Sequence, residues 1–352
     1  MTQPSSTDRP VIRYIDYLKG GLMLLVVLGH IVSRTGAAKA WIYGFHMPAF
    51  FFASGLLLRD GAEYGFEDAL SDAGKRFKRL MWPCFLWAVI YASLNPKNLA
   101  LIGYASHQTF SRAGALSSLW FLPVLFVAGL LYSLCRVVLG KHFGLIAKMV
   151  LIPLAFLVGE MFPPFRGGYP WGVNLAFWAL GFMLLGHLAS APIARLSLFV
   201  KQGRWNRLAA LLLAIVGLAG TMAFQFNRPG GAYVNFSGAM FGHPLLFVLV
   251  ACAGILLSVA VSVLLDTGTG DGRFWRWLEF VGRNSLCVFV VHKPLILLFR
   301  QTCRAMSFGE DATVVVSCMG TLAASCLLAM VFNRFCPTAL GKFPRRDAIR
   351  GT

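Results

Sequence analysis

The sequence predicts an all-α integral membrane protein with about ten transmembrane helices and both termini in the cytoplasm. Hydrophobic residues make up 57% of the 352 positions and charged residues only 13%, whereas a water-soluble domain carries about 25% charged residues. The apolar residues form long blocks rather than amphipathic stripes, so they must face lipid. The third observation is the uneven distribution of Lys and Arg among the segments between these blocks.

Ten apolar stretches are candidate spans, and three of them (80–95, 149–162 and 285–299) are shorter than the roughly 17–25 residues that cross a bilayer comfortably. The ten predicted stretches are 17–33, 41–58, 80–95, 116–138, 149–162, 171–189, 208–226, 241–265, 285–299 and 312–332.

The loop charges test this count. With the N-terminus in the cytoplasm, 22 of the 32 Lys and Arg residues fall in the inner segments and 8 in the outer loops, while Lys19 and Lys293 lie within spans. This asymmetry favours the alternating ten-helix arrangement. The net charge of +18 is therefore interpreted as topological, and no nucleic-acid partner is expected.

The first predicted span contains three ionisable residues, Asp16, Lys19 and His30. His30 is eleven positions after Lys19, which is close to three whole turns, so the two share one helix face about 16 Å apart. Asp16 stands at i,i+3 from Lys19, a spacing at which a carboxylate can pair with an ammonium. A neutral His can accept a proton near pH 7, so His30 is a candidate general base, although a lone His can also simply bond a neighbouring helix.

Further polar residues occur near other spans. Asn284 and Ser285 are predicted to cap the ninth helix with their side-chain oxygens. His292 lies seven residues after Ser285, nearly on the same face. Trp120 near the outer end of the fourth span is typical of an interfacial anchor, and His46 opens the second span from the outside.

The inner segment KRFKRLMWP concentrates four cations just before a helix: Lys75, Arg76, Lys78 and Arg79. They could serve topology alone or bind phosphate groups. The eight Cys residues form no CxxC pair, and neither metal ligation nor a disulfide is expected of them.

Five segments together carry a resemblance. The sequence resembles the acyltransferase-3 family of integral membrane O-acyltransferases, and its fucose 4-O-acetylase-like branch in particular, in RYIDYLKGGLMLLVVLGH, FHMPAFFFASGLLL, KRFKRLMWP, SLWFLPVLF and VGRNSLCVFVVHKPL. The family motif is a basic residue, ten intervening positions and then His, which Lys19 and His30 match. Lys19 stands where many members have Arg, and it lacks the bidentate fork of a guanidinium. The expected domains are a flexible cytoplasmic tail (1–12), the transmembrane domain (13–335) and a basic cytoplasmic tail (336–352).

The resemblance implies a multi-pass protein of the cell inner membrane that transfers an acetyl group from cytoplasmic acetyl-CoA, used as a co-substrate without a metal, to a hydroxyl of a cell-surface or lipid-linked glycan. The expected partners are that acceptor, membrane lipid and the polysaccharide synthesis machinery. In this reading His30 is the base, Asp16 holds Lys19 on the donor path, and Lys75, Arg76 and Arg79 meet the CoA phosphates. The expected acceptor-facing residues are His46, Trp120, Asn284, Ser285 and His292.

Two other functions fit the same residues. A transporter or flippase of a lipid-linked sugar would use His30, Lys19 and His292 to relay protons or grip its cargo, although the two related halves typical of transporters are not found in the sequence. A non-catalytic partner of a polysaccharide synthase is the third possibility. Within the enzyme reading, a covalent acetyl-His30 intermediate stays open.

Overall fold

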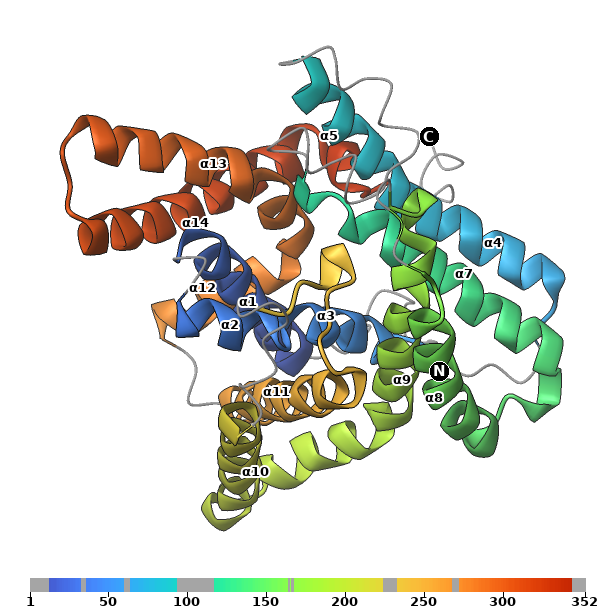
Figure 1. Cartoon of the computed structure of the whole chain (residues 1–352). Helices are drawn as coiled ribbons and strands as arrows, with labels where there is room; N and C mark the ends of the chain where they lie inside the picture. Colours follow the sequence, from blue (N-terminus) through green and yellow to red (C-terminus); the bar gives the residue numbers. More distant parts are fainter. Residues whose placement is uncertain are drawn as a thin grey trace, which may run out of the picture.

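The computed structural model describes residues 13–32, 36–59, 64–93, 117–163, 165, 168–223, 233–267 and 272–343, and these residues fold almost entirely into helices (Figure 1). The predicted tail 1–12 and the last part of the predicted tail 336–352 lie outside this set. The α-helices are α1 (Arg13–Ile31), α2 (Ala37–Tyr43), α3 (His46–Gly55), α4 (Phe66–Arg76), α5 (Trp82–Ser93), α7 (Phe121–Leu139), α8 (Leu145–Glu160), α9 (Val173–Lys201), α10 (Arg204–Ala223), α11 (Pro244–Leu265), α12 (Arg273–Arg283), α13 (Ser285–Ala305) and α14 (Glu310–Phe335).

Seven of these helices are long and apolar enough to cross a membrane: α1, α7, α9, α10, α11, α13 and α14. The all-α, multi-pass membrane fold is thus confirmed. Three predicted stretches form shorter helices among the described residues. Stretch 41–58 is divided between α2 and α3, because the backbone leaves the helical path at Phe45. Stretches 80–95 and 149–162 correspond to the 12-residue α5 and the 16-residue α8.

Helix α1 lies at the centre and packs against α2, α3, α11, α12, α13 and α14. Three pairs of consecutive helices lie around it. Figure 1 shows α13 and α14 running side by side away from the centre, with α10 and α11 paired on another side and α8 beside α9. The central position of α1 brings its side chains against residues from many parts of the chain.

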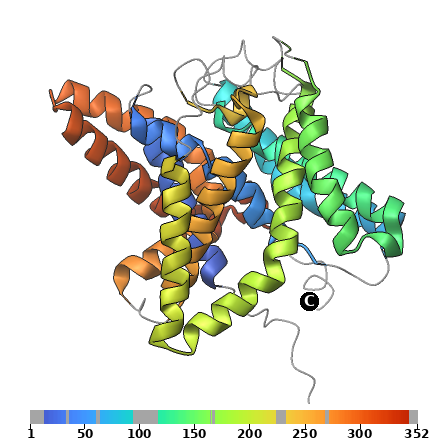
Figure 2. The same ribbon diagram turned by 60° about the horizontal axis from the view of Figure 1, so that its bottom comes forward.

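Two prolines shape the elements around this centre. Helix α9 contains Pro192, and it changes direction along its lower part (Figure 2); a proline inside a helix removes one backbone hydrogen bond and bends it. Between α4 and α5 the helix widens into a π-helical turn, Phe77–Met81. Pro83 follows two residues later and has no N–H to donate to the carbonyl of Arg79, which accounts for this loosened turn.

Two glycines allow α1 and α12 to approach closely. A Cβ on Gly282 would lie 1.8 Å from the backbone oxygen of Asp16, and one on Gly20 would lie 2.3 Å from that of Leu278. Real Cβ atoms do not come so near a backbone oxygen, so only glycine fits at both positions. This contact fixes Arg283, at the end of α12, beside the first turn of α1.

The first part of the predicted tail 336–352 packs onto the helices. Residues Pro337–Leu340 form a 3-10 turn, Leu340 is buried, and the indole of Trp87 donates to the carbonyl of Ala339 at 3.1 Å. Gly341 has φ +67° and lies against the backbone of Arg79. The chain therefore returns to the π-helical turn at the start of α5.

Candidate active site

Two histidines from distant parts of the sequence meet near the C-terminal end of α1. The ring centroids of His30 (α1) and His292 (α13) are 5.2 Å apart. Tyr43, at the end of α2, places its hydroxyl 3.4 Å from Nδ1 of His30. We refer to His30, Tyr43, His46, His292, Lys39 and Lys293 as the His30 group.

His292 is completely buried. Its Nδ1 lies 2.7 Å from the carbonyl of Phe289. A carbonyl only accepts hydrogen bonds, so Nδ1 must carry the proton, and in the neutral ring Nε2 then holds the lone pair. This Nε2 is buried and has no hydrogen-bond partner among the described residues. A buried acceptor without a donor is rare in proteins and marks a place where a further group can bind.

His46 joins the group from the first turn of α3. Its Nδ1 donates to the carbonyl of Ile42 at 2.8 Å, and its ring lies 4.8 Å from that of Tyr43. His46 is 4% exposed. Tyr43 and His46 are three positions apart, on either side of the junction between α2 and α3.

Two lysines bring positive charge to the same place. The ammonium of Lys39 lies 5.0 Å above the ring of Tyr43 and 5.2 Å above that of Tyr233, a cation–π arrangement. Lys293 donates a hydrogen bond to the hydroxyl of Ser117. Both ammonium groups are close enough to His30 to interact with it electrostatically.

The remaining residues predicted to face the acceptor lie elsewhere. Trp120 is 7% exposed and stacks on Phe236 at 5.9 Å, so it belongs to the aromatic core and is not a surface anchor. Asn284 precedes α13 but does not cap it. Its side-chain oxygen accepts from Asn333 at 2.7 Å and from Lys342 at 3.3 Å, which corrects the capping prediction. Ser285 starts α13, two turns away from His292.

The N-terminal end of α1 holds a second polar cluster, built from salt bridges. Asp16 pairs with Arg283 at 3.1 Å, Arg283 also pairs with Glu279, and Arg13 lies 3.7 Å from Glu279. We refer to these four residues with Lys19 and Arg79 as the Asp16 group.

The pairing of Asp16 with Lys19 that the spacing predicts is wrong, because no salt bridge within 4.0 Å joins these two described residues. The close contact at Gly282 places the guanidinium of Arg283 next to Asp16, and this tertiary partner replaces the local one. Lys19 is half-buried and interacts electrostatically with both Asp16 and Arg79. Arg79 has the same sign of charge as Lys19, so positive charge gathers between the start of α1 and the π-helical turn.

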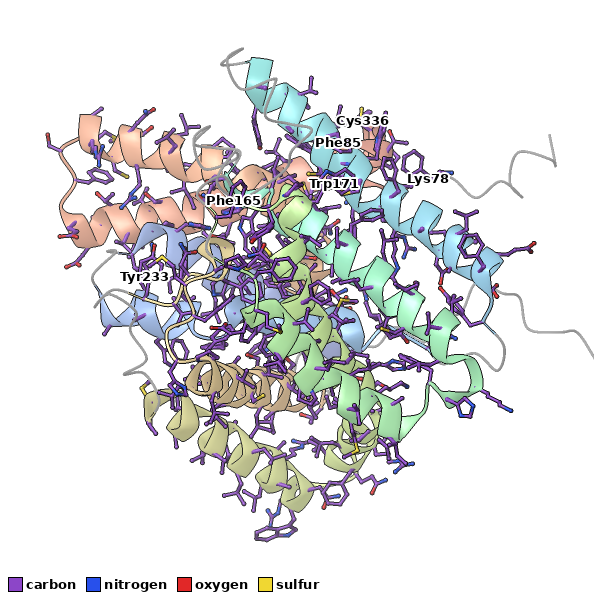
Figure 3. All side chains as sticks on the ribbon, turned by 45° about the vertical axis from the view of Figure 1, so that its right-hand side comes forward. Lys78, Phe85, Phe165, Trp171, Tyr233 and Cys336 are labelled. Carbon is purple, nitrogen blue, oxygen red and sulfur yellow. The ribbon has the colours of Figure 1, made fainter. Side chains whose placement is uncertain are left out.

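The cations predicted to meet phosphates differ in their surroundings. Lys75 is exposed and pairs with Asp72 at 3.2 Å. Arg76 lies against Gly129 of α7, and burial lowers the pKa of its guanidinium, which stays charged at neutral pH. Arg79 is exposed next to Gly341. Figure 3 shows Lys78 near α5 on one side of the molecule, whereas Tyr233 lies beside the helices of the His30 group.

Sequence reasoning missed Lys39, Tyr43 and Arg283 as members of these clusters. Lys39 and Tyr43 are four residues apart, on one helix face, and Lys39 is one of the eight cations that the charge count assigns to outer loops. Arg283 carried no local signal, since its partner Asp16 is 267 positions away. Among the described residues, no three His, Cys, Asp or Glu side chains are placed to hold a metal ion.

Comparison with known proteins identifies the family of the chain. The acyltransferase-3 family, described as "Acyltransferase domain", matches residues 12–330. Nodulation protein NolL of Sinorhizobium fredii (strain NBRC 101917 / NGR234) is 29% identical over 194 residues, which are 48% of this chain. The match covers 47% of NolL, about half the length of that relative. The family match spans α1 to α14, and the chain therefore belongs to the acyltransferase-3 family.

Proposed function

We propose that this protein is a membrane O-acetyltransferase that moves an acetyl group from cytoplasmic acetyl-CoA to a hydroxyl of a cell-surface or lipid-linked glycan. Family membership supports acyl transfer, and the apolar helices support a site within a membrane. The proposal includes ten spans, both termini in the cytoplasm, location in the cell inner membrane and contact with the polysaccharide synthesis machinery. The charge asymmetry of the loops supports this orientation.

The observation that carries the proposal is the His30–His292 pair. The two imidazoles come from α1 and α13 and lie with ring centroids 5.2 Å apart. Acyl transfer to a hydroxyl needs a group that removes the hydroxyl proton and one that returns a proton to the leaving thiolate. Two neighbouring imidazoles, one of them with a buried acceptor nitrogen that lacks a partner, can supply both.

In the proposed reaction His30 removes the proton of the acceptor hydroxyl, and the oxygen attacks the thioester carbonyl. When Nδ1 of His30 donates to Tyr43, Nε2 has the lone pair needed for this step. Collapse of the tetrahedral intermediate breaks the C–S bond, and the proton passes from the imidazolium of His30 to Nε2 of His292, which delivers it to the CoA thiolate. Lys293, close to His30, can stabilise the oxyanion that forms on the way.

The donor is proposed to enter from the Asp16 group. Lys19, Arg76 and Arg79, with Lys75 at the rim, offer positive charge to the phosphates of CoA. Lys19 lies roughly 16 Å along α1 from His30, a distance suited to the extended pantetheine arm. Asp16 acts here as a positioning residue, because it holds Arg283 and lies near Lys19.

Thiol release by the purified protein tests this function. Protein in detergent is mixed with acetyl-CoA and membranes that contain the acceptor, and free CoA is measured. Release that depends on the acceptor membranes supports the enzyme. A flippase would move the lipid-linked sugar without releasing CoA, so absence of release contradicts the proposal.

The His30→Ala variant tests the assigned base. We expect a loss of surface-glycan acetylation of about 100-fold or more, with normal amounts of protein in the membrane. His142→Ala is the matched control, since His142 is exposed in the turn between α7 and α8. This variant should acetylate the glycan at the wild-type level. Mass spectrometry of the glycan and immunoblots of the membranes give both readouts.

A further inference from the structure

Pro294 interrupts the backbone hydrogen bonding of α13 two positions after His292. In a regular α-helix the N–H of residue 294 would donate to the carbonyl of Val290, four residues earlier. Proline has no N–H, so this carbonyl loses its donor within α13. A buried carbonyl without a donor costs free energy. A partner from outside the helix is therefore expected at Val290.

Tyr91 of α5 supplies the missing donor. Its hydroxyl donates to the carbonyl of Val290 at 2.5 Å, and this bond joins positions 199 apart in the sequence. Tyr91 is only 8% exposed, so water does not compete freely for the bond. In membrane proteins, neighbouring helices often satisfy the backbone groups that a proline frees. A hydroxyl from a distant helix thus replaces the bond that Pro294 removes.

The carbonyl of Val290 lies in the turn of α13 that orients His292. Nδ1 of His292 donates to the carbonyl of Phe289, and the hydroxyl of Tyr91 donates to the next carbonyl along the chain. Side chains therefore hold two consecutive carbonyls of this turn. The imidazole of His292 lies beside that of His30, with 5.2 Å between the ring centroids. A rotation of this turn would change that distance, and proton transfer between the rings depends on it.

Helix α5 is fixed at a second point, so it can act as a support for α13. Trp87 lies one turn before Tyr91 on the same face of α5, and the two rings are 5.7 Å apart. The indole of Trp87 donates to the carbonyl of Ala339 and packs against Phe332 of α14 at 5.4 Å. These contacts tie α5 to the end of the described chain, independently of its bond to Val290.

We infer that Tyr91 is a positioning residue for the proposed reaction. Its hydroxyl replaces the hydrogen bond that Pro294 removes from α13, and it thereby holds His292 within reach of His30. This inference rests on the proposed function and adds a residue that acts through His292. Tyr91 transfers no proton itself, because its hydroxyl hydrogen is engaged by the carbonyl of Val290.

The Tyr91→Phe variant tests this role, because it removes the hydroxyl and keeps the ring. Purified protein in detergent is mixed with acetyl-CoA and membranes that contain the acceptor, and CoA release is expressed per folded protein in the monodisperse fraction of a gel filtration. We expect kcat to fall about tenfold and the KM for acetyl-CoA to stay within about twofold of the wild-type value. A lost donor site would raise this KM instead.

Tyr169→Phe is the matched control. The hydroxyl of Tyr169 also donates to a backbone carbonyl, that of Pro163 at 3.0 Å, but in an exposed position, so this variant should keep the wild-type kcat. A lower melting temperature of Tyr91→Phe with unchanged kcat would show that the bond only holds α5 against α13, and it would overturn the inference. If the wild type itself released no CoA in response to the acceptor, the acetyltransferase function would fail, and the inference with it.

A second substitution tests how Tyr91 acts. Pro294→Ala restores a backbone N–H that can donate to the carbonyl of Val290 within α13. In this background, addition of Tyr91→Phe should lower kcat by less than about threefold, because the carbonyl keeps a donor. An equal loss in both backgrounds would mean that the hydroxyl acts at another atom, and it would overturn the inference. Should Tyr91→Phe alone fail to accumulate, the comparison of the double variant with Pro294→Ala still decides the question.

Discussion

The two ends of α1 use charge in opposite ways. At the Asp16 group, Asp16 and Glu279 alternate with Arg13 and Arg283 in salt bridges, and the side chain of Arg283 is 50% exposed. At the His30 group, cations and histidines are largely buried without a nearby acidic stretch of sequence. At the first end both carboxylates are paired with arginines, whereas the second presents a histidine nitrogen without a partner among the described residues.

This difference suggests that the N-terminal end of α1 serves mainly helix packing and that its C-terminal end serves the reaction. Exposed salt bridges contribute little to stability and are screened by solvent. Perturbed, incompletely satisfied groups tend to cluster at functional sites. Substitutions at the His30 end should therefore change the reaction rate, and those at the Asp16 end should act mainly through packing and donor binding.

Apart from loss of the base itself, the largest expected effect on the rate comes from His292→Gln. The amide keeps a hydrogen-bond donor for Phe289 but cannot accept and return a proton, so we expect kcat to fall by about 100-fold, with normal membrane abundance. Turnover of acetyl-CoA by the purified variant measures this effect. His142→Gln serves as the matched control. Unchanged kcat in the His292 variant would remove this residue from the chemistry.

The packing at the other end is tested by Gly282→Val. Its Cβ would lie 1.8 Å from the backbone oxygen of Asp16, and neither helix backbone can move away cheaply. We expect a loss of about 3 kcal/mol or more in stability, seen as poor accumulation and a lower melting temperature in detergent. Gly203→Val is the control, because a Cβ there meets nothing within 4 Å. Normal accumulation of the Gly282 variant would contradict the close contact between α1 and α12.

A smaller effect is expected from Tyr43→Phe. The variant keeps the ring contacts with His46 and Tyr233 but loses the hydroxyl that lies 3.4 Å from His30. Because Tyr43 orients the base without reacting, we expect kcat to fall about tenfold and the acceptor KM to stay the same. The pH dependence of kcat should shift with it, since the hydrogen bond fixes the protonation of His30. A variant with an unchanged rate and pH profile would show that the hydroxyl does not position His30.

The smallest effect is expected from Asp16→Asn. The salt bridge to Arg283 is partly exposed, so its loss should cost less than about 1 kcal/mol. Lys19 does not depend on Asp16 for a direct salt bridge, and we expect the KM for acetyl-CoA to change no more than about threefold. Donor saturation curves in detergent provide the measurement. A loss of activity as large as that of His30→Ala would restore Asp16 to the catalytic centre.

Composition and apolar blocks were enough to predict the all-α membrane fold. Segments that face lipid need apolar side chains and a helical backbone that satisfies its own hydrogen bonds. Local interruptions were harder to predict. Stretch 41–58 reads as one apolar block, yet the chain breaks at Phe45, where the contacts of Gly44 and Phe45 with α11 decide the path. Helix α12 was not predicted, because it is short and its charged residues are typical of a loop between spans.

Part of the candidate site was also visible in the sequence. His30 and His292 stood out because ionisable residues within apolar segments are rare. Their proximity could not be predicted, since it depends on how α13 crosses α1. Asp16 shows the converse error, because the nearest partner along the helix gave way to Arg283 from α12.

The amino-acid sequence by itself determined which segments enter the membrane, which polar residues go with them and which long stretches lack acidic residues. These are properties of residue type and spacing, and the energy of transfer into lipid acts on each segment separately. Only the tertiary structure decided which of the polar residues meet. Contacts such as His30 with His292 and Lys39 with Tyr233 depend on close packing between helices, and that packing follows from the shapes of surfaces far apart in the chain.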